Sequence, residues 1–416
     1  MILESVDQKL GFVQGKGVAG IDVAEEWHYV QWLRPDGRPH GRPFRVANNR
    51  EGFAQVLAHR PTAEVIIGLE STGVYWHSLA HWLAQQPGVT VVFVNPAHVH
   101  RAKELDDNSP TKSDPKDAGV IARLVAQGRW LGWQRRDDIW AELRTLAVIR
   151  QQQRGAVTRW ENRIHAWLVQ YFPEFVTVFK NWRGKAAQWV LRHTPLPADC
   201  VAHGVAALAA GMLAATGHRV GPKRATALVA VAEQSIGVTT GAEAARYQLQ
   251  TSLRGWRWAR AMLARTEARQ RELVAQTGYG AVLQRLPGFG PVVVATLLGW
   301  LGDVTRFADP RQALKMAGLN LTHQSSGHHH GATHLSKRGQ PAVRCAWYQA
   351  AVVAIAKDAV WRAWYQRLVR RAKNPLPRKA ALVAVACKLL RVAWACARQQ
   401  MPYDAQRFAQ ASGVAG

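Results

Sequence analysis

Short apolar runs alternate with amphipathic segments over residues 17–130. Segments with helical spacing begin near residues 50, 73 and 114, after the third, fourth and fifth of these runs. The predicted order of elements is therefore β-β-β-α-β-α-β-α. The five runs have the length and flanking turn residues of strands, and they are GVAGIDVA (17–24), WHYVQWL (27–33), PFRVAN (43–48), AEVIIGLE (63–70) and VTVVFVNP (89–96).

This order distinguishes between two α/β folds. The first three strands are close enough along the chain to form a meander. A doubly wound dinucleotide-binding fold would alternate strands and helices from the start and would carry G-x-G-x-x-G after the first strand, which this chain lacks. The order favours the ribonuclease H-like fold.

The rest of the chain is predicted to be mainly helical. Residues 137–171 and 244–277 each place apolar residues four and three positions apart, interrupted in the first segment by Arg150 and Gln153. Two such helices form either an antiparallel arm or a dimer seam. The Ala- and Gly-rich residues 175–240 between them predict a small helical insert.

We therefore predict an α/β plus all-α protein. The C-terminal part is expected to be helical with a loop-rich stretch at 318–341. The predicted domains are an α/β domain at 1–135, a coiled-coil linker at 136–277 and a C-terminal domain at 278–416.

A helix begins within KSDPKDAGVIARL (112–124). Asp114 suits the N-cap, and Pro115 suits the first helical position. Asp117 then falls at the third position, where a negative charge favours the helix dipole. Capping alone would account for both aspartates, so a functional role needs support from elsewhere in the chain.

Two further carboxylates stand where predicted strands end. Asp22 and Glu70 lie near the carboxyl ends of neighbouring strands, at the edge where α/β sheets commonly place active sites. The helix starting at Asp114 would bring Asp114 and Asp117 to that edge on one face. Four carboxylates without lysine partners would repel one another, and a divalent cation removes the repulsion. Oxygen ligands select Mg²⁺ or Mn²⁺, so we predict a metal site at these four residues.

Charge is distributed unevenly along the chain. It has 54 Lys and Arg, 28 Asp and Glu, and a net charge of +26, but residues 1–130 hold 14 of each kind. Residues 131–416 thus hold 40 basic and 14 acidic residues and carry the whole excess. This indicates a polyanionic partner. No single amphipathic basic helix stands out, which favours nucleic acid over an anionic membrane surface.

Tryptophan and arginine interleave in this basic part, in LRGWRWAR (253–260) and WRAWYQRL (361–368). Such mixtures suit stacking on nucleic acid. Core tryptophans beside solvated arginines would give the same pattern.

The remaining composition indicates a cytoplasmic protein. No run of 18 or more apolar residues predicts a membrane span, and the N-terminus lacks a signal-peptide pattern. The four cysteines are scattered without metal-ligand spacing, which suits a reducing compartment.

The turn LPGFGP (286–291) lies between helical segments and resembles the hairpin of a helix-hairpin-helix element. Gly288 and Gly290 would there let backbone N–H groups approach a phosphate. An ordinary Pro-Gly turn is the alternative.

A polar stretch, QSSGHHHGATHLSKRG (324–339), follows. Lys337 and Arg338 could hold a phosphate for attack by Ser325 or Ser326, although a serine hydroxyl is a weak nucleophile until it is activated. From spacing alone, a solvated loop serine is the simpler interpretation. The run His328–His330 lacks paired cysteines, which favours a polar loop or phosphate contacts over a transition-metal site.

Together these motifs resemble the IS-one-ten family of insertion-sequence transposases, with its IS-eleven-eleven branch and the Piv DNA invertases. LPGFGP, AGL, SSG and SKRG occur in the order of the family's C-terminal transposase domain. The resemblance covers roughly 17–130 and 278–370. The residues similar to the family's DEDD tetrad are Asp22, Glu70 within GLESTGVYW, and Asp114 and Asp117 within KSDPKDA.

The resemblance implies a DNA recombinase with a RuvC-like, Mg²⁺-dependent domain and a serine that attacks a DNA phosphodiester to form a phosphoserine link. By motif position this serine is Ser326, directly before Gly327, with Ser325 in reserve. The chain departs from the family at Leu321 and Gln340, where proline and asparagine are common.

The resemblance also implies partners. These are double-stranded DNA at the element ends and target, a structured bridge RNA that guides several members, and further copies of the chain. Dimers assemble into tetramers in which the acidic domain of one protomer completes the site of another. A bacterial, nucleoid-associated protein is expected.

Two other functions stay open. A junction-resolving nuclease would cut with metal-activated water and form no covalent link, and a nucleic-acid-binding protein would carry a vestigial tetrad. The SSG segment favours the recombinase over the nuclease, because hydrolysis needs no serine. The intact tetrad disfavours the pure binding protein.

Overall fold

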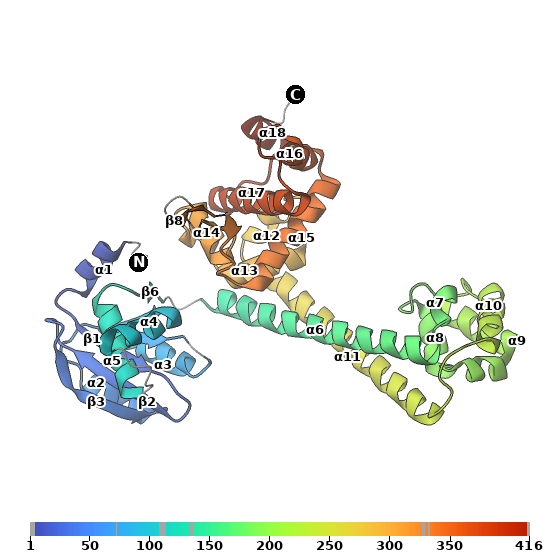
Figure 1. Ribbon diagram of the computed structural model, residues 1–416, viewed down its shortest axis with the longest axis horizontal. Helices are drawn as coiled ribbons and strands as arrows, with labels where there is room; N and C mark the ends of the chain where they lie inside the picture. The colour runs from blue at the N-terminus through green and yellow to red at the C-terminus, as the bar shows by residue number, and fades with distance from the viewer. Residues whose placement is uncertain are drawn as a thin grey trace. The chain divides into compact units, whose positions relative to one another are not determined.

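The chain of 416 residues divides into two units, Met1–Arg135 and Arg136–Gly416, each described here by itself (Figure 1). The first is an α/β unit and the second is mostly helical. The computed structural model describes residues 5–71, 73–107, 114–133, 137–323, 325–326, 329–331 and 333–413.

The α/β unit is built on a six-stranded mixed sheet with the order β3-β2-β1-β4-β5-β6. β1, β2 and β3 form the predicted antiparallel meander, β4 and β5 run parallel to β1, and β6 is antiparallel. The elements are α1 (Val6–Val13), β1 (Gly17–Asp22), β2 (Trp27–Leu33), β3 (Pro39–Ala47), α2 (Arg50–Ala58), β4 (Val65–Glu70), α3 (Trp76–Leu83), β5 (Val89–Val94), α4 (Pro96–Asp107), α5 (Asp114–Ala126) and β6 (Leu131–Gly132).

The hydrophobic pattern does not predict α1 or α4, but local capping signals mark both. Ser5 and Gln8 form a reciprocal capping box at the start of α1. At α4 the side chain of Asn95 accepts a hydrogen bond from the N–H of Ala97, and Pro96 occupies the first helical position. Neither helix has a strong apolar stripe, so the caps were the available signal.

Helix α5 lies on the sheet over two glycines. A Cβ atom at Gly20 of β1 would lie 2.2 Å from the carbonyl oxygen of Ala118, and one at Gly68 of β4 would lie 2.3 Å from Cγ2 of Val125. Real Cβ contacts are longer, so a side chain at either position would push α5 off the sheet. The two glycines thus set the distance between α5 and the strands.

The change Gly20→Ala is expected to destabilise the α/β unit by ~2 kcal/mol or more, because the nearest atoms belong to the backbone of α5 and cannot rotate away. Hydrogen exchange of the β1 and α5 amides in the full chain measures this, since it reports on that unit alone. Gly132→Ala in β6 is the matched control, because nothing lies within 4 Å of its added Cβ. Equal protection in both variants would refute the close-packing account.

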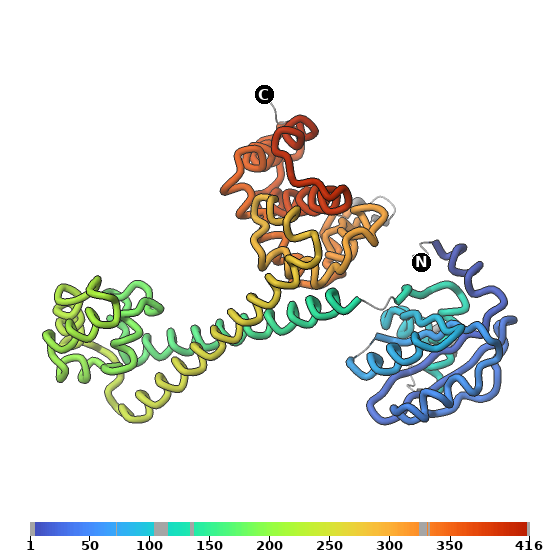
Figure 2. Tube along the Cα trace, turned by 180° about the vertical axis from the view of Figure 1, so that it is seen from behind, coloured from blue at the N-terminus to red at the C-terminus, as the bar shows by residue number. Residues whose placement is uncertain are grey.

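The helical unit is organised around two long antiparallel helices, α6 (Asp138–Tyr171) and α11 (Ala242–Gln276), which pack side by side (Figures 1 and 2). Both long helices predicted from the sequence are present. Arg150, which interrupts the apolar pattern, forms an ion pair of 2.9 Å with Glu267 of α11. Arg269 contacts both carboxylate oxygens of Glu142 at 2.7 and 3.2 Å.

Two hydrophobic clusters form along this helix pair. One combines the C-terminal half of α6 and the N-terminal half of α11 with the predicted helical insert. The insert consists of α7 (Phe175–Val178), α8 (Lys185–His193), α9 (Pro197–Thr216) and α10 (Pro222–Glu233).

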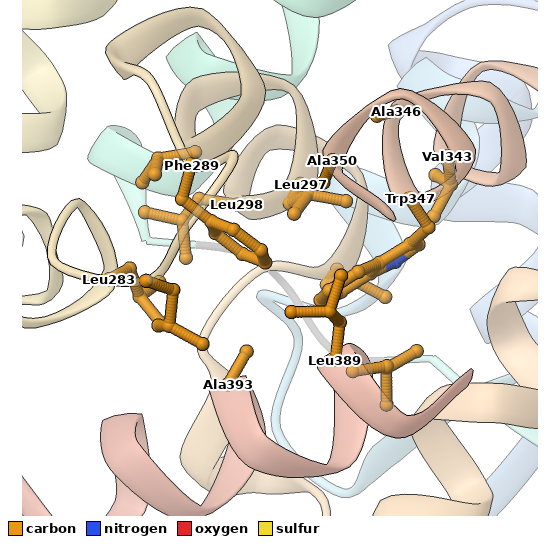
Figure 3. Packing of buried hydrophobic residues seen from close by; sticks show 14 of the residues in the cluster. Leu283, Phe289, Leu297, Leu298, Val343, Ala346, Trp347, Ala350, Leu389 and Ala393 are labelled. Atoms are coloured by element: carbon orange, nitrogen blue, oxygen red, sulfur yellow. The ribbon is translucent and has the colours of Figure 1, made fainter. Parts of the chain in front are cut away.

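The second cluster joins the opposite ends of α6 and α11 to the C-terminal helices. Figure 3 shows residues of its C-terminal part, among them Phe289 and Trp347. Phe289 and Trp347 meet edge to face within it, with ring centroids 5.4 Å apart. The C-terminal elements are α12 (Tyr279–Leu283), α13 (Pro291–Leu301), a 3-10 helix η1 (Val304–Arg306), α14 (Pro310–Ala317), β7 (Leu321–Thr322), β8 (Ser325–Ser326), β9 (His329–His330), β10 (His334–Leu335), α15 (Pro341–Lys357), α16 (Ala359–Arg370), α17 (Arg378–Gln399) and α18 (Ala405–Ser412).

Two helices in the described part of the chain, α9 and α17, are long and apolar enough to span a membrane by length and composition alone. Helix α17 contributes Val385, Leu389 and Leu390 to the second cluster. Helix α9 packs against α8 and α10 and is interrupted at Gly204, where φ is 75°. Both helices therefore use apolar residues for packing within the protein.

Candidate functional site

Asp22 and Glu70 lie side by side at one edge of the sheet, as predicted. Ile21 of β1 pairs in parallel register with Leu69 of β4, so the next residue on each strand is one of the two acids. Both acids are the last residues of their strands, and both are half-buried. The carboxyl ends of β1 and β4 thus form the first part of the site.

Asp117 reaches this region through α5. The carbonyl oxygen of Ala118 lies against Gly20 of β1. Asp117 is the residue before Ala118 in α5, and Asp22 lies two residues after Gly20 in β1. Asp117 is only 3% exposed. Asp114 is the first residue of α5 rather than the predicted N-cap, and its side chain lies outside the described residues. We call Asp22, Glu70 and Asp117 the acidic edge.

A lysine pairs with one of these carboxylates, contrary to the expectation of a lysine-free cluster. The Nζ atom of Lys103 in α4 forms an ion pair with Oδ2 of Asp117. The lysine side chain is 21% exposed and the aspartate side chain 5%. Oδ1 of Asp117 is buried and has no hydrogen-bond partner among the described residues. Lys103 lies on α4, which the hydrophobic pattern does not predict, although the Asn95-Pro96 start signal marks this helix.

The donor chemistry of the acidic edge fits a hard divalent cation. Carboxylates from two strands and a helix supply oxygen ligands, and Oδ1 of Asp117 is a buried oxygen without a partner in the described part of the chain. In this arrangement, however, no three His, Cys, Asp or Glu residues among those described lie close enough to hold a metal. The ammonium of Lys103 neutralises Asp117 instead.

Two loops beside the acidic edge are connected by a hydrogen bond. The hydroxyl of Tyr75, which follows β4, donates to Oε2 of Glu25, which follows β1, at 2.9 Å. This hydrogen bond and the negative charge of Glu25 raise the pKa of Tyr75. The hydrogen bond links the loops that follow the two acid-bearing strands.

Ser325 and Ser326 lie in a β-hairpin rather than in the irregular loop expected from the sequence. Ser325 pairs with His330 and Ser326 with His329, in antiparallel register. The short strands β7 and β10, which precede β8 and follow β9 in the sequence, also pair with each other. The side chains of both serines, and residues 327–328, lie outside the described residues. We call the two strand pairs, β7 with β10 and β8 with β9, the serine hairpin.

The segments AGL and SKRG pack against each other at the base of the serine hairpin. The N–H groups of Ser336 and Lys337 donate to the carbonyls of Asn320 and Gly318, at 2.8 and 3.2 Å. A Cβ at Gly339 would lie 2.5 Å from a carbonyl oxygen of α14. The glycines of both segments are therefore needed for this close backbone packing.

Lys337 adopts a left-handed backbone conformation with φ of 51°. This conformation costs a non-glycine residue about 1 kcal/mol or more, and such strain is concentrated at functional sites. Lys337 and Arg338 are both exposed. Their exposure is compatible with the phosphate contacts predicted for them, which stay a prediction.

The LPGFGP turn has a structural reason for one of its glycines. Gly288 has φ of 86°, and a Cβ there would lie 2.3 Å from the carbonyl oxygen of Ala350 in α15. Gly290 precedes α13, with nothing within 4 Å of an added Cβ. Packing accounts for Gly288, and phosphate binding at both glycines stays a prediction.

Comparisons with known protein families match the parts of the chain that carry these features. Residues 19–173 match the DEDD domain of IS110, described as a transposase, and residues 280–366 match the transposase IS116/IS110/IS902 family. Together the two matches cover more than half of the chain. The chain belongs to the IS110/IS116/IS902 transposase family. The first match contains the acidic edge and the second contains the serine hairpin.

Individual relatives of this IS110-family transposase include proteins of insertion elements and of a DNA inversion system. An uncharacterised 43.6 kDa protein of IS110 from Streptomyces coelicolor is 26% identical over 405 residues, 93% of this chain and 95% of that protein. An uncharacterised 42 kDa protein of IS900 from Mycobacterium paratuberculosis is 25% identical over 400 residues, 92% and 96%. The pilin gene-inverting protein of Moraxella lacunata is 22% identical over 366 residues, 86% and 89%.

Membership in this family makes the chain a transposase, an enzyme that catalyses DNA strand transfer. Its DEDD domain generally implies a divalent metal, in agreement with the oxygen donors of the acidic edge. Residues 174–279 lie outside both family matches and include the helical insert and all of α11.

Proposed function

We propose that this transposase is a metal-dependent DNA recombinase in which Ser326 becomes covalently linked to DNA. The observation that carries the proposal is the serine hairpin, held by backbone hydrogen bonds between AGL and SKRG in a chain that also has the acidic edge. A hydrolytic nuclease would need the acidic edge alone. The strand order supports a RuvC-like, ribonuclease H-like N-terminal domain. The packing of α6 against α11 supports a coiled-coil linker, and the position of LPGFGP between α12 and α13 supports a helix-hairpin-helix element.

Asp22, Glu70, Asp114 and Asp117 would hold Mg²⁺ or Mn²⁺. When bound, the cation would supply positive charge that stabilises the reacting phosphate and lowers the pKa of an attacking hydroxyl. Lys103 keeps Asp117 neutralised until then. The Tyr75–Glu25 hydrogen bond links the loops that follow β1 and β4.

The chemical step at Ser326 is a transesterification. Its Oγ attacks the phosphorus, a serine–phosphate ester bond forms, and the bond from phosphorus to one deoxyribose oxygen breaks. The serine proton leaves to a base and the released deoxyribose oxygen takes up a proton. Attack by a second DNA hydroxyl reverses the exchange and frees the serine. Lys337 and Arg338 would hold the phosphate through charge-assisted hydrogen bonds.

The expected partners follow from charge and family. The excess of +26 in residues 131–416 supports binding to double-stranded DNA at the element ends and target, and to a bridge RNA. We propose a homodimer that assembles into a tetramer with composite sites, in the nucleoid of a bacterial cytoplasm. Site-specific inversion is a second candidate, favoured by the similarity to the pilin gene-inverting protein.

An SDS-resistant protein–DNA adduct is expected when the chain acts on labelled DNA carrying its gene with the native flanking sequence, in the presence of Mg²⁺ and of RNA transcribed from that flanking sequence. Mass spectrometry of the trapped peptide should identify phosphoserine, because the ester survives denaturation. EDTA provides the control without metal. Cleaved DNA without an adduct would indicate the hydrolytic nuclease, and binding without cleavage would indicate a vestigial tetrad.

A further inference from the structure

The segment LRGWRWAR of α11 contains one buried and one exposed tryptophan. Trp256 is 1% exposed, and its Nε1 donates to Oε1 of Glu161 at 3.3 Å. Its ring lies 4.9 Å from that of Trp182 in the core of the insert. Trp258, two residues later, is 66% exposed. Core packing therefore explains Trp256 and leaves Trp258 without a structural role.

Trp258 belongs to a continuous exposed face of α11. Residues spaced alternately four and three positions apart lie on one side of a helix. Here that side is turned away from the seam residues Leu249, Leu253 and Trp256. We call this face the outer strip, and it consists of the exposed residues Tyr247, Thr251, Arg254, Trp258, Ala261 and Arg265.

The part of α11 that carries the outer strip is basic. Between Glu243 and Glu267, α11 has five arginines and no acidic residue. One of the five, Arg246, is paired with Asp199, and Arg260 lies over the Trp256 ring at 4.7 Å. The other three are exposed, lie within two helical turns of Trp258 and form no ion pair among the described residues. They are Arg254, Arg257 and Arg265.

These charges decide between possible partners. A second copy of the strip would place arginine near arginine, and an apolar peptide would leave the guanidinium groups uncompensated. Nucleic acid satisfies both features, because its phosphates pair with arginine and its bases stack on indole. Within a duplex the bases stack on one another and offer no free ring face, so an indole platform indicates an unpaired base.

We propose that the outer strip binds single-stranded or looped nucleic acid, with an unpaired base stacked on Trp258 and backbone phosphates on Arg254 and Arg265. Tyr247 lies about 16 Å further along the helix, at 1.5 Å per residue, and offers a second stacking position. The inference rests on the proposed nucleic-acid partner and is independent of Ser326 and of metal binding.

Fluorescence polarisation of the full chain with three labelled probes tests the proposal. The probes are an RNA hairpin with an unpaired loop, single-stranded DNA of the same length and a blunt DNA duplex. Trp258→Ala should weaken binding of at least one unpaired probe by about 5- to 100-fold, the range for loss of one base–aromatic stack. Duplex affinity should change by less than about twofold, since charge alone holds the duplex. Trp258→Phe should restore most of the loss because it keeps a ring.

Trp27→Ala is the matched control, because Trp27 is 43% exposed and carries Arg45 over its ring at 4.8 Å in the α/β unit. It should leave all three affinities unchanged. Arg254→Gln and Arg265→Gln should each lower the slope of log Kd against log[salt] by roughly 0.7 for an unpaired probe. Preference for the RNA hairpin would identify a folded RNA as the natural ligand, and preference for single-stranded DNA would identify a displaced strand.

Unchanged binding of both unpaired probes by Trp258→Ala would overturn the proposal, as would an equal loss for all three probes. A change in sedimentation with unchanged nucleic-acid affinity would replace it with a protein interface. Failure of the recombinase proposal is distinguishable, because a chain that forms no serine adduct would still show the selective loss at Trp258.

Discussion

The change Ser326→Ala is expected to eliminate the covalent adduct and to lower strand transfer by about 10³-fold or more, the scale seen when an enzyme loses its nucleophile. The family motif position assigns the nucleophile to Ser326, directly before Gly327. Ser325→Ala, one position away in the same hairpin, is the matched control and should keep most activity.

The measurement is the yield of adduct and of joined DNA at equal DNA occupancy. Circular dichroism and DNA affinity should be unchanged in both variants, because each change removes a single hydroxyl group. Activity in Ser326→Ala but not in Ser325→Ala would move the nucleophile by one position. Activity in both would favour metal-activated water.

Mixing experiments with the same variant address the composite site. Asp22→Ala and Ser326→Ala, each inactive alone, should regain adduct formation when mixed, since some mixed dimers combine an intact acidic edge with an intact serine hairpin. If both variants bind DNA and dimerise but mixing restores nothing, each site is formed within one chain.

The strands and long helices were predictable because their patterns are long and regular. Apolar runs that end near Asp22 and at Glu70 predicted both the strand positions and the shared edge. The 4-3 spacing of Leu249, Leu253 and Trp256 predicted the seam of α11, and all three are buried. Trp258 lies on the opposite side because two residues turn a helix by about 200°.

Short polar elements were not predictable in the same way. The strands of the serine hairpin are two residues long and lack alternation, so their pattern resembles a loop. Lys103 lies on a helix with a weak apolar stripe, and its contact with Asp117 joins residues 14 positions apart. Such a contact depends on how α4 and α5 pack, which local spacing does not specify.

The change Asp117→Asn is expected to eliminate high-affinity Mn²⁺ binding and to destabilise the packing of α4 against α5. Asparagine has the same shape but loses the charge, and the ammonium of Lys103 is left unpaired in a largely buried position. Stranding a buried charge costs 3–5 kcal/mol, and with Lys103 partly exposed we expect ~2–3 kcal/mol. Asp36→Asn, in an exposed turn of the same unit, is the matched control.

The double variant Lys103→Met/Asp117→Asn separates the two effects. It removes the stranded charge and should recover most of the lost hydrogen-exchange protection in α4 and α5, while Mn²⁺ binding stays absent. Lys103→Met alone keeps the carboxylate and removes the competing ammonium, so its Mn²⁺ affinity, measured by the electron paramagnetic resonance signal of free Mn²⁺, should exceed that of the unmodified chain. Normal Mn²⁺ binding by Asp117→Asn would show that Asp117 only anchors α4, and reduced affinity in Lys103→Met would show that the lysine supports the site rather than competing with the cation.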